Sequence, residues 1–330
     1  MSSMSSTYER AMLRRAAAWE DHPSWRGLSV AVLREVAERE GIDFATALVF
    51  DRLVRSPEHG PFIERVRSAA TDDRRGRRPG LLAIVPGVGY VEYPQTGADG
   101  GRLREAARGW GWRVETVPVA SFGRLADNAR AISDWLTRRS EEPIVLVSLS
   151  KGGADVKTAL ASPETAGGFR GVGVWLDVSG ILHGTPLAGW FLRRWYRRLL
   201  LRWAGWRRGF DGSILRELDR GAGGPLAASS IVPSRMNVVH VVGIPLSCHL
   251  RSKRARRGHR RLAEYGPNDG GGILLGDLCR LPGRIYPVWG ADHYLEPGWD
   301  LCPLIRRILH AALEERRETV AVTSCCDRDA

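Results

Sequence analysis

Residues 141–156 read EEPIVLVSLSKGGADV, and this stretch joins three kinds of local pattern. Ile144–Val147 is a continuous apolar run, which is typical of a strand covered on both faces. Two serines follow, two positions apart, and then Gly152 and Gly153 open a segment with helical spacing. The order strand, turn, helix predicts one repeating unit of a parallel α/β sheet.

The same alternation continues on both sides of this stretch. Short apolar runs predict strands within residues 81–87, 112–119, 143–150, 171–180, 237–247 and 284–293. Helical patterns follow at residues 98–110, 124–140, 151–162 and 301–317. We therefore expect an α/β fold with a mostly parallel sheet and helices on both of its faces.

Two further regions lie outside this alternation. Residues 1–75 carry helical patterns and predict an N-terminal helical extension, which ends in a charged linker at residues 71–80. Residues 76–330 then form the α/β domain. Between its fourth and fifth strands, residues 184–235 differ in character and predict a helical cap insertion.

The pentapeptide Ser148-Leu149-Ser150-Lys151-Gly152 has the pattern small-x-Ser-x-Gly between a strand and a helix. A tight turn of this kind exposes the central serine, and it requires small residues two positions before and after. Ser150 is then a nucleophile and Ser148 the first small residue. The alternative is a parallel strand that ends in a polar turn, with the serines as helix caps.

A serine nucleophile needs a base, which in this arrangement follows the serine and an acid along the chain. His293 comes directly after the last predicted strand and is the expected base. The other histidines precede the serine, lie within predicted elements, flank the arginine-rich stretch or follow the fourth strand too early: His22, His59, His183, His240, His249, His259 and His310.

The acid should lie between the serine and His293. Asp269, in the glycine-rich segment YGPNDGGG, is the expected partner, although a structural turn would also explain it. Asp277 and Asp177 are alternatives. Asp292 adjoins His293 and is expected to point away from it. Two backbone N–H groups should stabilise a developing oxyanion, that of Lys151 and, in the turn PGVGY, that of Val88.

The segments VPGVGY, VLVSLSKGG, GPNDGG and VWGADHY, together with GILHGTPLAGW at 180–190, resemble the α/β-hydrolase superfamily, and within it the lipases and esterases. The resemblance covers roughly residues 80–317. It implies the α/β-hydrolase fold and a Ser-His-Asp hydrolase that forms an acyl-enzyme without a metal or organic cofactor. Ser148 stands where glycine is usual, and Lys151 stands where His, Gln or Met is commoner. The Lys151 cation could favour an anionic substrate or simply reach solvent.

The formal net charge of +12 is local. Residues 193–208 contain seven arginines and no acid, and residues 251–261 contain six arginines, one lysine and no acid. The rest of the chain is therefore close to neutral, so the basicity belongs to particular surfaces.

On a helical wheel, residues 190–208 place an apolar arc opposite most of their arginines. The arc consists of Leu192, Trp195, Tyr196, Leu199, Trp203 and Trp206. Three interpretations stay open: a cap helix packed on the body, a lid or interface helix that docks on anionic lipid, and a nucleic-acid site. No nucleic-acid fold motif supports the third, so we do not expect a nucleic-acid partner.

Residues 251–261 predict an exposed loop or short helix. A charged surface segment exposed to solvent would explain these residues. An anion-binding site near the rim of the active site would also explain them, and Arg254 and Arg257 would contribute to it.

The first residues are polar and charged, so we expect no secretory leader; the sequence shows no long apolar run, and the five cysteines have no metal spacing. We expect a cytoplasmic protein, which would be peripheral to a membrane if the arginine-rich helix docks there. The expected function is a lipase-like serine esterase that cleaves a carboxylic ester. The alternatives are a thioesterase or acyltransferase of the same fold and a non-catalytic binding protein.

Overall fold

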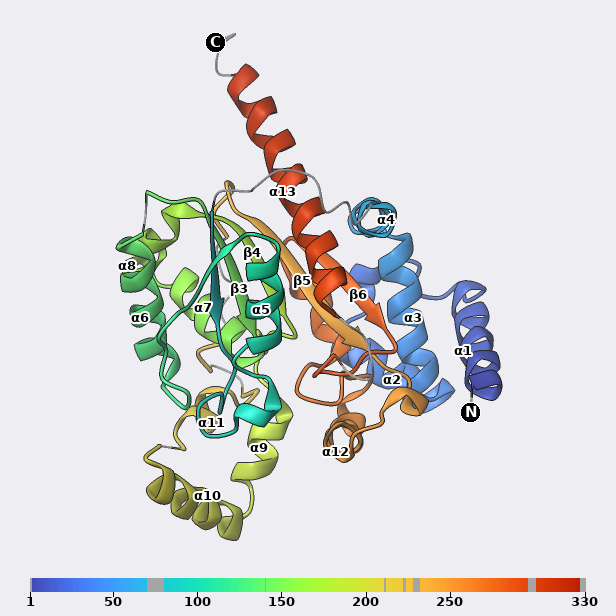
Figure 1. Cartoon of the computed structure of the whole chain (residues 1–330). Helices are drawn as coiled ribbons and strands as arrows, with labels where there is room; N and C mark the ends of the chain where they lie inside the picture. Colours follow the sequence, from blue (N-terminus) through green and yellow to red (C-terminus); the bar gives the residue numbers. More distant parts are fainter. Residues whose placement is uncertain are drawn as a thin grey trace. The chain divides into compact units, whose positions relative to one another are not determined.

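The computed structural model describes residues 2–69, 80–139, 141–210, 212–221, 224–227, 232–295 and 301–326. Within them, six strands form one sheet in the order β2-β1-β3-β4-β5-β6 (Figure 1). The strands are β1 (Leu81–Val85), β2 (Arg113–Thr116), β3 (Ile144–Leu149), β4 (Val172–Val178), β5 (Asn237–Ile244) and β6 (Arg284–Trp289). β1 pairs in parallel with β2 and β3, and β3 pairs in parallel with β4. The predicted α/β class with a mostly parallel sheet is confirmed.

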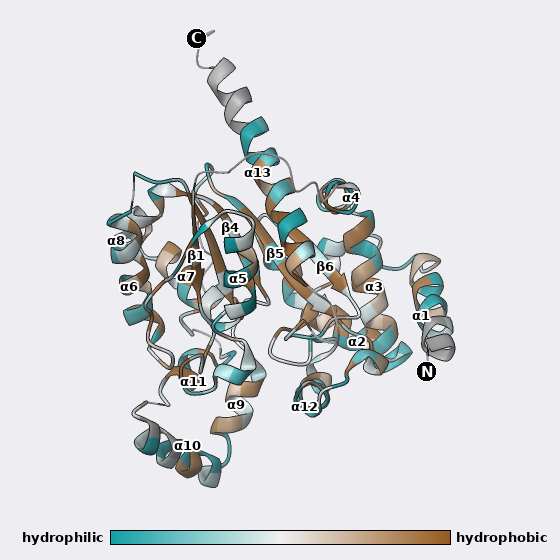
Figure 2. Ribbon diagram, viewed as in Figure 1, coloured by the Kyte–Doolittle hydropathy of each residue, from teal (hydrophilic) through white to brown (hydrophobic). Residues whose placement is uncertain are grey.

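The direction of the crossovers places helices on both faces of the sheet. α5 (Gly101–Gly109) connects β1 to β2 in one direction, whereas α6 (Leu125–Thr137) and α7 (Lys151–Ala161) connect strands in the opposite direction. Because such connections are right-handed, opposite directions put the helices on opposite faces. β1 and β4 are buried along their whole length, and Figure 2 shows both strands in the hydrophobic colour.

The chain divides into two compact units. One contains Met1–Glu64, Thr185–Leu187 and Val241–Trp299, and the other contains Arg65–Gly184, Ala188–His240 and Asp300–Ala330. The predicted boundaries at residues 75/76 and 184–235 stay predictions, and residues 71–79 of the predicted linker lie outside the described residues.

The first unit begins with the N-terminal helices. They are α1 (Ser2–Ala17), α2 (Val30–Glu40), α3 (Ile42–Arg55) and α4 (Gly60–Ser68). The buried guanidinium of Arg52 donates to the carbonyl oxygens of Ala16, Trp19 and His22. These bonds fix the end of α1 and the chain that follows it, because carbonyls at a helix end have no partner within the helix. The ring of Phe50 on α3 packs 4.7 Å from that of Trp289 on β6.

The basic segments form separate helices. The predicted helix over 190–208 is two, α9 (Pro186–Leu192) and α10 (Trp195–Arg208), because Arg194 between them is extended. Arg197 donates to the carbonyl of Trp190, at 2.7 Å, and so supplies a partner to the last turn of α9. α12 (Lys253–Leu262) follows Ser252, whose hydroxyl accepts the N–H of Ala255 as an N-cap.

The remaining helices are α8 (Pro163–Ala166), α11 (Ile214–Glu217) and α13 (Leu301–Cys326), of which the last is longer than the sequence predicted. In the part of the chain that the structure describes, no helix combines the length and the apolar character that a membrane span requires.

Candidate active site

Ser150 lies at the turn between β3 and α7, in a backbone conformation that few residues other than glycine adopt. Its φ is 50° and its ψ is −112°. Backbone hydrogen bonds hold this turn: Ser150 N–H donates to the Val178 carbonyl at 3.0 Å, and the Ser150 carbonyl accepts from Gly153 and Ile181. Strain of this kind costs about 1–3 kcal/mol and clusters at functional sites. The predicted strand-turn-helix context of Ser150 is therefore present.

The glycines after Ser150 are required by close packing. A Cβ on Gly152 would lie 2.5 Å from the carbonyl oxygen of Val85, and a Cβ on Gly153 would overlap the Asp177 carboxylate. Both contacts are with atoms that have little room to move. Residues 152 and 153 are therefore glycine because α7 begins against the ends of β1 and β4.

Ser148 is buried and belongs to a polar network beneath the turn. Its hydroxyl donates to Asp177 Oδ1, at 2.7 Å, and accepts from Trp175 Nε1, at 2.9 Å. The other Asp177 oxygen lies 3.1 Å from His240 Nδ1. Both carboxylate oxygens of Asp177 thus have partners other than His293. This argues against Asp177 as the alternative acid of the triad. The sequence signal for this network was the presence of polar residues within otherwise apolar strands.

The side chain of Lys151 is buried, with 1% of it exposed. Its ammonium group lies 2.8 Å from each carboxylate oxygen of Asp155, which also accepts from Asn128 Nδ2. Burial raises the pKa of Asp155 to about 6, although the Lys151 charge and these hydrogen bonds act in the opposite direction. The interpretation of Lys151 as a side chain in solvent is wrong, and the pairing of its charge with Asp155 argues against a bias toward anionic substrates.

The Lys151–Asp155 pair makes a prediction for stability. Asp155→Ala should lower the free energy of unfolding by about 3–5 kcal/mol, because it leaves a buried ammonium without its partner. The double variant Lys151→Met/Asp155→Leu removes both charges and should recover most of that loss. Urea unfolding measures both. An Asp155→Ala protein as stable as the wild type would contradict the buried pair.

Two backbone segments lie next to Ser150, the start of α7 and the turn after β1, and the roles predicted for the Lys151 and Val88 N–H groups stay predictions. Lys151 is the first residue of α7, so its N–H has no acceptor within the helix. The turn after β1 approaches from the other side, since a Cβ on Gly87 would lie 3.5 Å from Ser150 Cβ. The Gly87 N–H already has an acceptor, because it donates to the Ala98 carbonyl at 2.8 Å. The next N–H group along this turn is that of Val88.

Asp269 and His293 form a hydrogen-bonded pair in the other unit. Asp269 Oδ2 lies 2.6 Å from His293 Nδ1, and the His293 N–H donates to the Asp269 carbonyl at 2.7 Å. Asp269 Oδ1 accepts three backbone N–H groups, from Gly271, Gly272 and Ile273, each at 2.9 Å. Both side chains are buried. The glycine-rich turn therefore aims the carboxylate at the imidazole, as the sequence predicted.

The charge state of Asp269 decides the tautomer of His293. Burial acts to raise the pKa of Asp269, but the His293 ring and the backbone donors outweigh it, so the pKa lies below its usual value. An ionised carboxylate only accepts hydrogen bonds, so Nδ1 of His293 carries the proton. A neutral ring then keeps its lone pair at Nε2, as a general base requires.

Gly271 provides a test of this pair. A Cβ at residue 271 would overlap the ring of His293. Gly271→Ala should displace the imidazole and lower kcat/KM for an ester substrate about a hundredfold, the usual effect of a displacement near 1 Å. Gly109→Ala, at a helical glycine with open space around it, is the matched control and should retain activity. A folded Gly271→Ala protein with normal kinetics would contradict this packing.

The structure also places the remaining predicted residues. Asp277 lies in the short helical segment Leu275–Arg280, 4.0 Å from the Arg280 guanidinium. The guanidinium of Arg254 lies 4.2 Å from the centre of the Tyr294 ring. Tyr294 directly follows His293 in the chain. Arg257 is exposed on α12. Trp195, Trp203 and Trp206 are exposed on α10.

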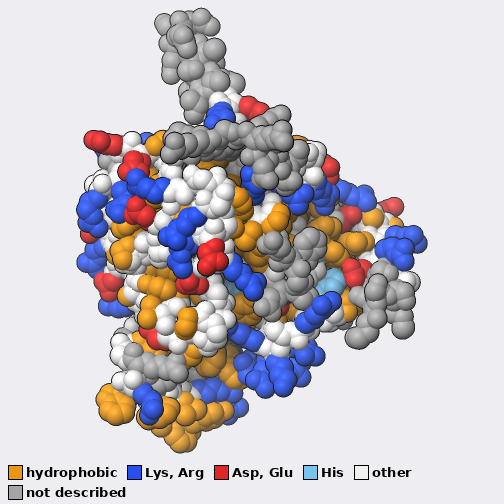
Figure 3. All heavy atoms as spheres, in the orientation of Figure 1, with side chains coloured by type: hydrophobic (Ala, Val, Ile, Leu, Met, Phe, Trp, Pro, Cys, Tyr) orange, Lys and Arg blue, Asp and Glu red, His pale blue; other side chains and the backbone are white. Residues whose placement is uncertain are grey.

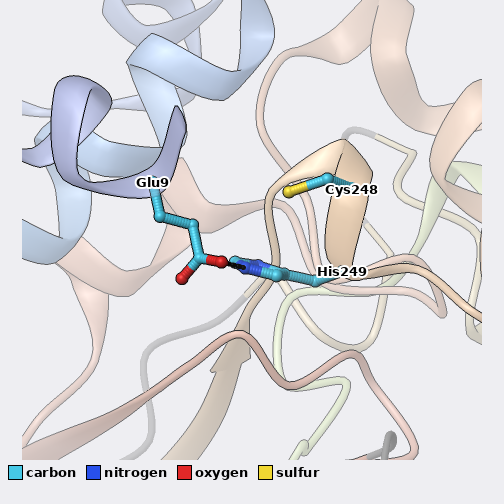
Figure 4. Close-up of side chains that lie close together, drawn as sticks. All are labelled: Glu9, Cys248 and His249. Carbon is cyan, nitrogen blue, oxygen red and sulfur yellow. Dashed lines mark ion pairs between the residues drawn. The ribbon is translucent and has the colours of Figure 1, made fainter. Parts of the chain in front are cut away.

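Figure 4 shows a cluster that sequence reasoning missed, formed by Glu9, Cys248 and His249. Their ligand atoms lie within 4.8 Å of one another, as in a metal site. However, His249 Nδ1 accepts the Leu246 N–H, at 2.9 Å, so the ring proton is on Nε2, which faces Glu9 at 3.2 Å. Neither ring nitrogen then offers a lone pair to a metal, and we assign no metal site here.

No family model matches the sequence, and neither does any curated protein. Solved structures do match. A metagenomic carboxyl esterase is 21% identical, with a TM-score of 0.55 over 74% of this chain and 77% of that one. A mature lipase from Bacillus licheniformis is 19% identical, with a TM-score of 0.51 over 66% of this chain and 86% of that one. Together with the parallel sheet and its strand-turn-helix centre, these similarities show that the chain has the α/β-hydrolase fold.

Proposed function

We propose that this chain is a serine hydrolase that cleaves carboxylic esters through an acyl-enzyme, with Ser150 as nucleophile, His293 as base and Asp269 as its orienting acid. The observation that carries the proposal is the strained backbone of Ser150 at the start of α7. The buried Asp269–His293 pair supplies the other requirement. The structural neighbours named above are an esterase and a lipase, which supports ester hydrolysis at the level of the fold.

The proposed reaction has two halves. Ser150 Oγ attacks the ester carbonyl while His293 Nε2, brought within hydrogen-bond reach, takes the hydroxyl proton. The oxyanion accepts the N–H groups of Lys151 and Val88, each of which contributes about 10²–10³ to the rate. His293 then gives its proton to the leaving alkoxide, and the acyl group stays on Ser150. Water, deprotonated by His293, attacks this ester, and the acid and free serine result.

Lys151 contributes to this scheme through its backbone alone. Its ammonium group is paired with Asp155 inside the chain, so it adds no free cation beside the substrate. The positive end of α7 and the two N–H groups therefore provide the stabilisation of negative charge. This arrangement predicts no special preference for anionic acyl groups.

The proposal is tested on the full wild-type chain with a fluorophosphonate probe and a series of 4-nitrophenyl esters. We expect one covalent adduct per chain, located by mass spectrometry within residues 141–161, and turnover of at least one ester. Added alcohols and amines as acceptors show whether water or another nucleophile takes the acyl group. A chain that neither reacts with the probe nor hydrolyses any of the esters would rule out the enzyme.

A further inference from the structure

The exposed large hydrophobic side chains gather in one place. Nine are exposed among the residues that the structure describes, and seven of these lie between Phe191 and Trp206. They are Phe191, Trp195, Tyr196, Leu199, Leu200, Trp203 and Trp206. Figure 3 shows hydrophobic side chains gathered in the region of α10, with basic side chains beside them. Single exposed apolar residues are ordinary, but a contiguous set of this kind marks a contact surface.

The orientation of α10 shows that this surface is turned outward. Gly205 is buried, and a Cβ there would overlap the Phe210 carbonyl. Arg197 folds inward, with its guanidinium 3.4 Å from the centre of the Trp190 ring. Arg197 lies on the side of the helix opposite Trp195 and Trp206, and Gly205 lies about a quarter turn away from them, given about 100° per residue. Arg197 and Gly205, rather than the tryptophans, are therefore turned toward the chain that flanks α10.

The exposure of the tryptophans decides between two of the interpretations made from the sequence. Trp195 is 67% exposed, Trp203 57% and Trp206 82%. A cap helix packed on the body by its apolar arc would bury these rings. The apolar arc of α10 instead faces solvent, which favours the interpretation that a binding partner covers it.

The charge around the arc indicates the chemistry of that partner. Arg198, Arg202 and Arg207 are exposed and lie along the two margins of the arc. No acidic residue occurs between residues 178 and 210. α12 provides a contrast, because it is as basic but carries no exposed large hydrophobic side chain. Of these two helices, α10 alone combines exposed apolar side chains with a cationic rim, which are the two features of a helix that binds anionic lipid surfaces.

We propose that α10, together with Phe191 in the preceding helix α9, docks the protein on anionic lipid bilayers. Tryptophan rings and Leu199 would enter the boundary between headgroups and acyl chains, and the arginines would pair with lipid phosphates. Nucleic acid would leave the aliphatic residues Leu199 and Leu200 without a contact. A second copy of the chain would bring two arginine-rich, acid-free surfaces together, which like charges oppose.

The test uses vesicle co-sedimentation with the full-length Ser150→Ala chain, so that lipid hydrolysis cannot alter the vesicles and the result does not depend on the proposed reaction. The vesicles are pure phosphatidylcholine or contain about one third phosphatidylglycerol. We expect at least about tenfold stronger partitioning onto the anionic vesicles, a loss of binding as salt rises from about 0.1 to 1 M, and a blue shift of tryptophan fluorescence.

Variants assign the binding to α10. Arg198→Gln/Arg202→Gln/Arg207→Gln should weaken partitioning about a hundredfold, near fivefold per charge. The matched control Arg108→Gln/Arg138→Gln/Arg170→Gln removes the same charge from exposed sites that have no exposed large hydrophobic side chain beside them, and it should bind as the parent does.

The second variant, Trp203→Ser/Trp206→Ser, keeps the charge and should lose about tenfold or more. Unfolding midpoints verify that each variant is folded.

Several outcomes would overturn the proposal. Equal binding to both kinds of vesicle, or an equal loss in the matched control, would mean that α10 has no special role. Binding of single-stranded oligonucleotide that fails in the same α10 variants, without binding to vesicles, would assign the surface to nucleic acid. A wild-type dimer that becomes monomeric in Trp203→Ser/Trp206→Ser would assign it to self-association.

Discussion

Ser150→Ala should lower kcat/KM for an activated ester about a millionfold and abolish labelling by a fluorophosphonate. A loss of this size follows from removal of a nucleophile that acts as a unit with its base. The variant should fold, because its backbone keeps the hydrogen bonds with Val178, Gly153 and Ile181. Initial rates and intact mass after labelling measure the two effects.

Ser148→Ala is the matched control for this prediction. It removes the same group two residues away, where the hydroxyl bonds Asp177 and Trp175 rather than facing the substrate side of the turn. Two buried polar atoms lose a partner, so we expect the free energy of unfolding to fall by about 1–3 kcal/mol. Labelling should persist. If Ser148→Ala lost the label and Ser150→Ala kept it, the assignment of the nucleophile would be wrong.

Asp269→Asn should lower kcat about ten-thousandfold with little change in fold. The Oδ1 position accepts three backbone N–H groups, so the amide of asparagine must place its carbonyl there. Its NH₂ group then faces His293 Nδ1 and forces that nitrogen to accept a hydrogen bond. The ring proton moves to Nε2, and the base can no longer take a proton from serine. Steady-state kinetics measure the loss.

Asp277→Asn is the control, because Asp277 was the other acid in the same segment of sequence and lies beside Arg280. It should keep kcat within about tenfold, as expected of a residue outside the reacting groups. Equal losses in both variants would remove the reason for choosing Asp269. A full loss in Asp277→Asn alone would give the role to that residue.

The same carboxylate has a consequence for acid stability. The pKa of Asp269 is lowered in the folded chain, so its ionised form stabilises the fold at pH above the ordinary aspartate pKa of about 3.9. This contribution is lost as pH falls through the lowered value. Asp269→Asn lacks this contribution. The difference in unfolding free energy between the wild type and this variant should therefore decrease as the pH falls.

Much of the fold could be predicted from the sequence because five of the six described strands, all but the edge strand β2, are buried along most of their length. The apolar run of β3 and the glycines at residues 152 and 153 mark the strand-turn-helix unit in one line of sequence. Asp269 was recognisable for a similar reason, since a turn rich in glycine leaves several N–H groups free to bind one carboxylate. Local patterns of this kind report local geometry directly.

Other features depend on residues that are distant in sequence or on subtle breaks in a pattern. The burial of Lys151 requires Asn128, from a different helix, as well as Asp155. The break between α9 and α10 follows from one extended residue and a contact of Arg197 with Trp190, within a stretch that has helical spacing throughout. Periodicity alone also does not say which face of α10 meets solvent.

The Lys151–Asp155 pair links two positions that a reader of the sequence would treat as independent. Because each charge is buried against the other, neither can be replaced alone without a cost, whereas both can be exchanged together for neutral residues. In evolutionary terms, the residue that follows the nucleophile and the residue four positions later should change as one. An apolar residue at 151 together with a retained aspartate at 155 would thus be a combination that natural variants of this chain avoid.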